Sequence, residues 1–456
     1  MKLALIGHAS WLVDTPDTRI LFDPLLFDPN QGDCYEVHPS RRVHVPELAD
    51  VDVVVVSHRH IDHFDVRSLC SLPKTAAVLC PRDPLIVKTL EAIGFGKVRV
   101  VEDWDRVRCG DTTIVATPSR NPVPEHGFVV SDGRHTIWNQ VDTQVAPETT
   151  TEINRTYGRL DVLIAPWQPL LELKFQLNES TSFPHQAYAD LIRQASGCAT
   201  KVLIPGASGF RYGSRSRWLN RIAFPVARDR FAEDVRRALP RKDTAIHQVN
   251  PGDEIVCHGD APEIGRQTAT VASSVAGEED LVAFCPVDPF QDLFRDRAPL
   301  TTAECGVSSI VDDLDRFIQR ELANTSSPLC AYGRWEVRYQ LIVCFEAGNL
   351  FVNWDFTHGA RRVDGRNLSA NATSIISGRI LRALARGACS WEEAYHSGGW
   401  RFFQSVAVVS PTDYVVPPAE TVVDIVQLRY PYAESLDRLI ATELERWAGT
   451  GRRTGG

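Results

Sequence analysis

Three histidines and one aspartate lie close together in the segment from His58 to His63. Imidazole nitrogens and carboxylate oxygens are the usual protein ligands of zinc and iron, so this density indicates a metal site. Side chains alternate along an extended chain, which directs His58 and His60 to the same side. A helical turn after His60 would bring Asp62 and His63 alongside them. We therefore expect two neighbouring metal pockets; a solvated, histidine-rich loop is the alternative.

Short apolar runs on either side of this segment predict the elements that position it. Residues 52–56 are rich in valine, which is typical of a strand buried on both faces, so the polar cluster begins where that strand ends. His8 lies in a predicted turn, where it could approach the cluster or face solvent. The other predicted strands here are Lys2–Ile6, Trp11–Asp14, Arg19–Phe22 and Lys97–Glu102, and the predicted helices are Asp65–Leu72 and Pro84–Ile93.

The His-X-His-X-Asp-His order, behind a hydrophobic strand and the Asp-Pro turn at Asp23, resembles the motif of the metallo-β-lactamase superfamily. The resemblance covers roughly the first half of the chain. It implies an α/β fold, an αββα sandwich of two mixed sheets with helices outside, and a centre of one or two metals at one edge. The superfamily includes hydrolases, redox enzymes and oxygenases, so the fold alone does not decide the reaction.

The resemblance also implies an aspartate that bridges the two metals from the end of a later strand. Asp142 matches this position, after a strand predicted over Thr136–Val141. A strand-end aspartate that caps the following turn is the alternative.

Two histidines that the superfamily normally supplies are missing. Asn121 stands where the first is expected, and Glu125 or His126 could reach the metal instead. No histidine follows the strand predicted near residues 202–205, and His185, before a predicted helix, is the nearest candidate to replace it. A solvated Glu125 and a first-turn helix residue at position 185 are the alternatives. If either ligand is absent, a symmetric dizinc hydrolase site becomes a poorer fit.

Composition limits the class of protein. The chain has 456 residues, of which 43% are hydrophobic and 23% charged, as in ordinary globular proteins. A formal net charge of −9 argues against nucleic acid as the main partner. No apolar run approaches the roughly 20 residues that a membrane span needs. Eleven cysteines without a Cys-X-X-Cys pair favour reduced thiols and a cytoplasmic location.

The last third of the chain predicts a second, smaller α+β domain. Helices are expected over Ser309–Asn324 and Ser374–Arg386, with a hairpin of strands between them. The run from Ile375 to Ala394 weakly resembles sterol-carrier-like modules, which could cover the metal pocket or bind an apolar ligand; simple packing is the alternative. The predicted divisions are a metal-binding domain over 1–265, a linker over 266–305, an α+β domain over 306–448 and a disordered tail over 449–456.

An excess of arginine between residues 211 and 230 is unusual in an acidic chain. Guanidinium groups pair with phosphates in bidentate fashion, so this region could receive an anionic handle of a substrate, such as a nucleotide, coenzyme A or phosphopantetheine. A solvated basic face is an equal alternative. The candidate residues are Arg211, Arg215, Arg217 and Arg221.

The order of these features also resembles CMP-N-acetylneuraminate hydroxylase, a Rieske enzyme. The paired Cys-X-His and Cys-X-X-His of a Rieske cluster do not occur in this chain, so an oxidising centre would have to be the metal site itself. The chain thus resembles the nonheme diiron monooxygenases of bacterial natural-product pathways, which include a hydroxylase of a diterpenoid coenzyme A ester on the platensimycin route.

This resemblance implies two iron ions, O2 as co-substrate and hydroxylation of an unactivated C–H bond in a small-molecule substrate. No flavin or nicotinamide fingerprint is evident, so electrons would come from an external donor or reductase. The alternative is a zinc-dependent hydrolase of a phosphoester, lactone or amide, in which a metal-bound hydroxide is the nucleophile. A lipid carrier with a structural metal is a third alternative.

Overall fold

Apolar runs in the first half of the chain form two mixed β-sheets. The first sheet has eight strands in the order β18-β17-β1-β2-β3-β6-β7-β8. Its strands are β1 (Lys2–Gly7), β2 (Ser10–Asp14), β3 (Arg19–Phe22), β6 (Val53–Val55), β7 (Ala77–Cys80), β8 (Val98–Val100), β17 (Glu254–Val256) and β18 (Glu263–Gly265).

The second sheet has seven strands in the order β16-β14-β13-β12-β11-β10-β9. Its strands are β9 (Arg106–Cys109), β10 (Thr112–Pro118), β11 (His126–Ser131), β12 (Thr136–Asn139), β13 (Leu160–Ala165), β14 (Thr200–Pro205) and β16 (Ala245–Ile246). Two small ladders complete this part of the chain. They pair β4 (Tyr35–Val37) with β15 (Phe210–Tyr212), and β5 (Arg41–Val43) with β19 (Ala272–Ser274).

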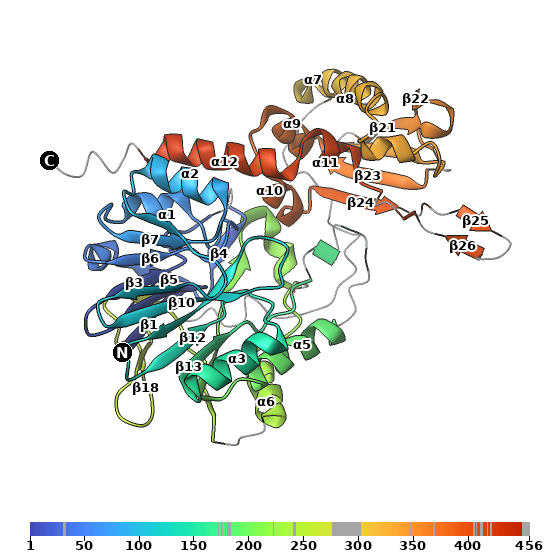
Figure 1. The fold of residues 1–456 in the computed structure, drawn as a ribbon. Coiled ribbons are helices and arrows are strands. Elements are labelled where there is room, and N and C mark those ends of the chain that lie inside the picture. The colour runs from blue at the N-terminus through green and yellow to red at the C-terminus, as the bar shows by residue number, and fades with distance from the viewer. Residues whose placement is uncertain are drawn as a thin grey trace. The chain divides into compact units, whose positions relative to one another are not determined.

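A hydrophobic core fills the space between the two sheets. It joins residues of the first sheet to residues of the second, among them Leu3, Val13, Phe22, Val55, Phe128, Val162 and Ile204. A second cluster joins the other face of the second sheet to three helices, α3 (Pro147–Tyr157), α5 (His185–Ser196) and α6 (Arg228–Ala238). Helices α1 (Val66–Ser71) and α2 (Pro84–Ile93) lie alongside β6 and β7 (Figure 1). The predicted α/β sandwich is confirmed.

Strand direction brings several strand ends to one edge of the sandwich. Both β1 and β3 run antiparallel to β2, and β3 runs parallel to β6, so these three strands end on the same side. In the second sheet β12, β13 and β14 are parallel, and β10 shares their direction because β11 is antiparallel to both β10 and β12. The loops that follow these strands carry most of the predicted site residues.

The computed structural model describes the chain except for residues 31–32, 172, 175–176, 178, 180–183, 222, 240–242, 276–301, 346–347, 368–369, 405, 407, 411–413, 417, 420–421 and 449–456. The chain divides into two compact units. The first unit contains Met1–Leu170, Phe183–Cys285 and Ile440–Gly456, and the second contains Leu171–Ser182 and Pro286–Leu439.

The second unit is built on a five-stranded sheet in the order β22-β21-β20-β23-β24. The strands are β20 (Arg338–Phe345), β21 (Gly348–Asp355), β22 (Arg361–Asp364), β23 (Ala372–Ser377) and β24 (Trp400–Gln404), with a separate hairpin of β25 (Val408–Ser410) and β26 (Tyr414–Val416). The helices are α7 (Thr302–Cys305), α8 (Val307–Leu322), α9 (Gly378–Arg386), α10 (Trp391–His396), α11 (Ile425–Arg429) and α12 (Tyr432–Trp447), whose last residues group with the first unit.

Two predictions for the later part of the chain need correction. The helix expected from Ser374 begins only at Gly378, because Ile375 and Ile376 extend β23, which pairs in parallel with β20. The Ser377 side chain accepts a hydrogen bond from the Ile380 amide and caps the helix. The linker expected over 266–305 begins inside the first unit, where β19 pairs with β5. Most of this linker, and the tail expected from residue 449, lie outside the described residues.

Candidate metal centre

The loop after β6 places the histidine-rich segment at the sheet edge. The backbone amides of His63 and Phe64 both donate to the His60 carbonyl, which closes the helical turn expected after His60. Arg59 points the other way and forms a bidentate pair with Asp83, with Nε to Oδ2 at 2.6 Å and Nη2 to Oδ1 at 2.8 Å. The carboxylate of Asp83 is fully buried. This pair fixes the loop from which the histidine side chains project.

Four side chains from three strand ends meet at one point. The Nε2 atom of His63 lies 3.1 Å from Asp142 Oδ2 and 3.3 Å from His8 Nε2. The same His8 nitrogen lies 3.2 Å from Asp62 Oδ2. Ligand atoms of His8, Asp62 and His63 all lie within 4.8 Å of one another, and so do those of His58, His63 and Asp142. Two overlapping groups of this kind, which share His63, suit a pair of metal ions.

A buried glutamate completes the other side of the cluster. His58 Nε2 lies 2.9 Å from His60 Nδ1, and His58 Nδ1 lies 3.4 Å from Glu125 Oε1. The second oxygen of Glu125 accepts hydrogen bonds from Ser119 Oγ at 2.7 Å and from Asn121 Nδ2 at 2.6 Å. These two donors hold the carboxylate so that Oε1 faces His58. Burial raises the pKa of Glu125.

Asp23 orients His63 from behind. Its carboxylate is completely buried and accepts from the Ser57 amide at 2.7 Å, from Ser57 Oγ at 2.7 Å and from His63 Nδ1 at 2.9 Å. With the proton on Nδ1, the lone pair of His63 lies on Nε2, the nitrogen that faces Asp142 and Asp62. Metal-binding histidines are commonly held by a carboxylate in this manner.

Three residues at the cluster adopt the left-handed backbone conformation that most residues avoid. The φ angles are 51° for His8, 39° for Asp23 and 52° for Val141, the residue before Asp142. For a β-branched valine this conformation is a genuine outlier. Such strain tends to gather at functional sites, where the surrounding structure holds it in place. The turn at Val141 also ends β12 earlier than predicted and presents Asp142 to the cluster.

The electrostatics of the cluster favour a cation. Burial disfavours a charged His63, but Asp62 and Asp142 outweigh burial and raise the pKa of His63 well above its usual value. Burial disfavours a charged Asp62 as well, and His63 and His8 outweigh it, so the pKa of Asp62 is well below its usual value. Burial and the neighbouring imidazoles lower the pKa of His58. Imidazoles and concentrated carboxylates around one point are a donor set that fits divalent iron or zinc.

Comparison with known protein families agrees with this fold. Residues 18–205 match a family described as the beta-lactamase superfamily domain. The fold is that of the metallo-β-lactamases.

Similar proteins of several kinds share this metallo-β-lactamase fold. A Mycolicibacterium smegmatis protein named as a Rieske 2Fe-2S iron–sulfur protein is 29% identical over 189 residues, which are 38% of this chain and 36% of that protein. A UPF0173 metal-dependent hydrolase of Salinibacter ruber is 26% identical over 183 residues, 36% of this chain and 72% of the hydrolase. The chain thus spans only about a third of the first relative's length.

Two solved structures show a weaker likeness to this chain. CmlA, a diiron beta-hydroxylase from Streptomyces venezuelae, has a TM-score of 0.40 and 16% identity, with 58% of this chain and 54% of CmlA covered. An isothiocyanate hydrolase from Delia radicum gut bacteria has a TM-score of 0.40 and 16% identity, with 56% of this chain and 99% of the hydrolase covered. These likenesses concern the fold alone.

Two candidate ligands lie away from the cluster. The His126 ring lies against β8, where Nε2 donates to the Val101 carbonyl at 3.2 Å and Nδ1 lies 3.4 Å from Asp103 Oδ1. His185 is exposed at the first position of α5, which matches the alternative stated for it, a residue in the first turn of a helix. Asn121, in the place of a superfamily histidine, holds Glu125 and also donates to the Asp142 carbonyl at 3.2 Å.

Two residues contribute more than the sequence suggested. His8 was predicted only as a possible extra metal ligand or a residue behind the ligands, and its Nε2 lies among the candidate ligand atoms. Asp23 was noted only for its turn, yet it holds His63. The signal for both is position: each directly follows a strand, β1 or β3, whose end shares an edge with the end of β6.

The arginine cluster is only partly available for an anionic substrate. Arg211 pairs with Glu36, with Nη2 at 2.8 Å from Oε2. Arg217 is exposed in the 3-10 segment Ser214–Arg221. The side chains of Arg215 and Arg221 lie outside the described part of the structure.

Across the described residues, no helix is both long enough and apolar enough to cross a membrane. The ten described cysteines are free thiols.

Proposed function

We propose that the chain is a nonheme diiron monooxygenase that hydroxylates a C–H bond of a small molecule. One observation carries the proposal: a buried carboxylate, Glu125, lies beside His58, with Oε1 3.4 Å from Nδ1, in the region where the superfamily normally supplies a further histidine. His60 lies at the opposite nitrogen of the same ring, Nε2. Two histidines and one carboxylate, with other positions open, are the ligand pattern of iron(II) oxygenases. A set of three imidazoles would instead have suited a zinc hydrolase.

The proposed ligands divide into two groups joined by one aspartate. His58 and His60 would hold the first iron through Nε2 and Nδ1, and Glu125 would have to turn from His58 Nδ1 towards them to join as the carboxylate ligand. Asp62 and His63 hold the second, and His8 completes this group in place of the missing last histidine. Asp142, 3.1 Å from His63 Nε2, links the two groups. Iron ions bound in this way supply the reduction of O2 and the oxidation of a C–H bond.

The protein's own contribution is to fix these ligands and keep water out. Asp23 sets the protonated nitrogen of His63, and Ser119 with Asn121 fixes the carboxylate of Glu125. The side chains of His58 and Glu125 are each only 1% exposed, so solvent does not compete for that side of the centre. Ligands held in advance need little reorganisation during the reaction.

Electrons and substrate are proposed on the resemblance alone. We expect an external reductase or other electron donor, and a small-molecule substrate of natural-product type. The most specific form of this proposal is that the substrate is a terpenoid coenzyme A ester. Its phosphates would have to use arginines other than Arg211, which already pairs with Glu36.

A metal-dependent hydrolase is the second candidate. The Salinibacter ruber relative is named as one, and the match covers 72% of its length. In that case the same side chains would hold zinc, and the substrate would be a phosphoester, lactone or amide.

Metal analysis of anaerobically purified protein, together with O2 consumption after reduction, separates the two candidates. We expect two iron ions per chain and O2 uptake that His60→Ala abolishes. The matched control is His185→Ala, which removes an exposed histidine outside the cluster and leaves iron and O2 uptake unchanged. Protein that binds only zinc, stays inert to O2 after iron reconstitution and hydrolyses phosphoesters or lactones would refute the oxygenase.

A further inference from the structure

A cavity of about 290 Å³ lies within the first unit, and His8 is one of the residues that line it. Its walls come from the loops after β13 and β14, from the start of α6 and from the segment before β17. The loop after β14 is the place where the superfamily's last histidine is expected, and Ser208 lines the cavity there. His8 is therefore a wall of this cavity while its Nε2 belongs to the metal cluster.

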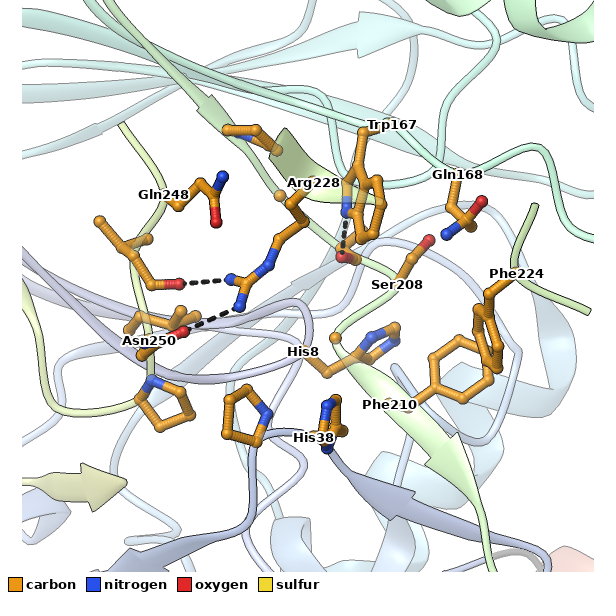
Figure 2. Close-up of a pocket in the computed structure, with 18 of the residues that line it drawn as sticks. His8, His38, Trp167, Gln168, Ser208, Phe210, Phe224, Arg228, Gln248 and Asn250 are labelled. Atoms are coloured by element: carbon orange, nitrogen blue, oxygen red, sulfur yellow. Dashed lines mark hydrogen bonds between the residues drawn. The ribbon is translucent and has the colours of Figure 1, made fainter. Parts of the chain in front are cut away.

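One end of the cavity is aromatic. Figure 2 shows Phe210 and Phe224 on the side opposite the Arg228 guanidinium, and their ring centroids lie 5.3 Å apart. Phe210 also contacts His8, with ring centroids 5.4 Å apart. The Trp167 indole donates to the Ala207 carbonyl at 3.1 Å, which fixes the ring in the wall. Rings held in this way offer a preformed apolar surface to the body of a ligand.

The other end of the cavity is positive. Arg228 donates to the Val249 carbonyl and to Asn250 Oδ1, both at 2.9 Å (Figure 2). Both acceptors are neutral, and no acid of the described chain lies within ion-pair distance of this half-buried guanidinium. Helix α6 begins at the same place, and its cap residue, Ala227, has no side-chain acceptor for the first amides. The guanidinium and the helix start therefore both favour an anion.

Asp229 limits how much negative charge this end can accept. Its carboxylate lines the cavity beside Arg228 and accepts a hydrogen bond from Gln248 Nε2. Asp253 also attracts Arg228 and Arg266 repels it, but these two pair with each other at 2.7 Å, so their effects largely offset. An arginine with Asp229 beside it suits a ligand with a single negative charge better than a doubly charged phosphate.

We propose that this cavity binds a small carboxylic acid with an aromatic or compact apolar body. The carboxylate pairs with Arg228, and the body lies against Trp167, Phe210 and Phe224. A volume of about 290 Å³ is at the small end of ligand pockets, so one ring with a short chain is the expected size. Binding of this acid does not depend on the proposed oxygenase. A role for the acid as substrate would rest on that proposal, since only His8 is shared by the cavity and the metal cluster.

Calorimetric titration of the metal-loaded full chain tests the proposal with three probes of one shape: 4-phenylbutyrate, its neutral amide, and 3-phenylpropyl phosphate. We expect the acid to bind at least tenfold more tightly than either analogue. Arg228→Gln should weaken binding of the acid roughly 10- to 100-fold, the range for a lost charged hydrogen bond, and leave the amide unchanged.

Two further variants guard against a trivial result. Gln248→Glu adds a negative charge at the same end and replaces the hydrogen bond to Asp229 with a repulsive carboxylate pair, while the Arg228 guanidinium stays in place. It should therefore weaken binding of the acid even if Arg228→Gln fails to fold. Arg230→Gln is the matched control, because Arg230 is exposed on the same helix and pairs with Asp234. It should leave binding unchanged.

The proposal is overturned if the acid and the amide bind with equal affinity, or if the phosphate binds most tightly. It is also overturned if neither Arg228→Gln nor Gln248→Glu weakens binding of the acid. Its failure is distinct from that of the proposed function. Binding of the acid by a chain that never consumes O2 supports the pocket and refutes the oxygenase. O2 uptake by a chain that binds none of the three probes refutes the pocket and leaves the oxygenase.

Discussion

The substitution Asp23→Asn tests whether the buried cluster is a metal centre, whichever metal it holds. Asp23 accepts from three donors, the Ser57 amide, Ser57 Oγ and His63 Nδ1. Asparagine keeps one acceptor oxygen and replaces the other with a donor. If the oxygen stays on the Ser57 amide, the new NH2 group faces the two remaining donors. His63 must then carry its proton on Nε2, which is the nitrogen that faces Asp62 and Asp142.

The expected loss follows from this change of tautomer. Removing a partner that orients a metal-binding histidine lowers metal affinity about 10- to 100-fold. This range corresponds to about 1.4 to 2.7 kcal/mol of binding free energy. Anaerobic competition with a chromophoric chelator, run with Fe²⁺ and with Zn²⁺, measures it directly.

Asp161→Asn is the control for the loss of any buried carboxylate in this domain. Asp161 accepts from the Thr136 amide and from Lys201 Nζ, both at 2.8 Å, on β13 away from the cluster. It should lower the free energy of unfolding without changing metal affinity. If Asp23→Asn binds metal within twofold of the natural chain, Asp23 does not set the state of His63 and the reasoning fails.

Two other predictions concern stability and thiol chemistry. Arg59→Ala leaves the buried carboxylate of Asp83 without its bidentate partner, so the free energy of unfolding in urea should fall by about 3 kcal/mol; an unchanged value would show that this pair does not hold the loop. Burial raises the pKa of several thiols to about 12, namely Cys80, Cys198 and Cys257. Because the thiolate is the reactive form, a native Cys285→Ser chain at pH 8 should show one fast thiol towards a disulfide reagent, the exposed Cys330; a second fast thiol would contradict this.

The layered fold was predictable because its evidence is local. Runs such as residues 53–55 can be buried only as strands between other layers, and Asp83 with Pro84 marks the start of α2. The helix expected from Ser374 was wrong because β-branched residues there extend a strand. The serine that caps α9, at position 377, was the local signal that this reading missed.

The part of the candidate site that is contiguous in sequence was the most directly predictable, because His58 to His63 lie in one loop. Asp142 and Glu125 were predicted through the family resemblance, and two residues separate Asp142 from the end of β12. His8 and Asp23 reach the cluster because β1 and β3 are both partners of β2, an arrangement that no local pattern encodes. The direction of His126 likewise depends on which face of β11 meets β8, so its distance from the cluster could not be read from spacing.

The shared position of His8 has a consequence for the energetics of binding. One face of its ring borders the cavity, and one nitrogen belongs to the metal cluster. If a ligand in the cavity changes the affinity for the metal by some factor through this ring, the bound metal must change the affinity for that ligand by the same factor, because linkage between two sites is reciprocal. A ligand in the cavity would then change the affinity for the metal, and the metal would change the affinity for the ligand, through a single imidazole. The preference of the cavity among ligands can therefore be measured as a change in metal affinity, even for ligands that never react.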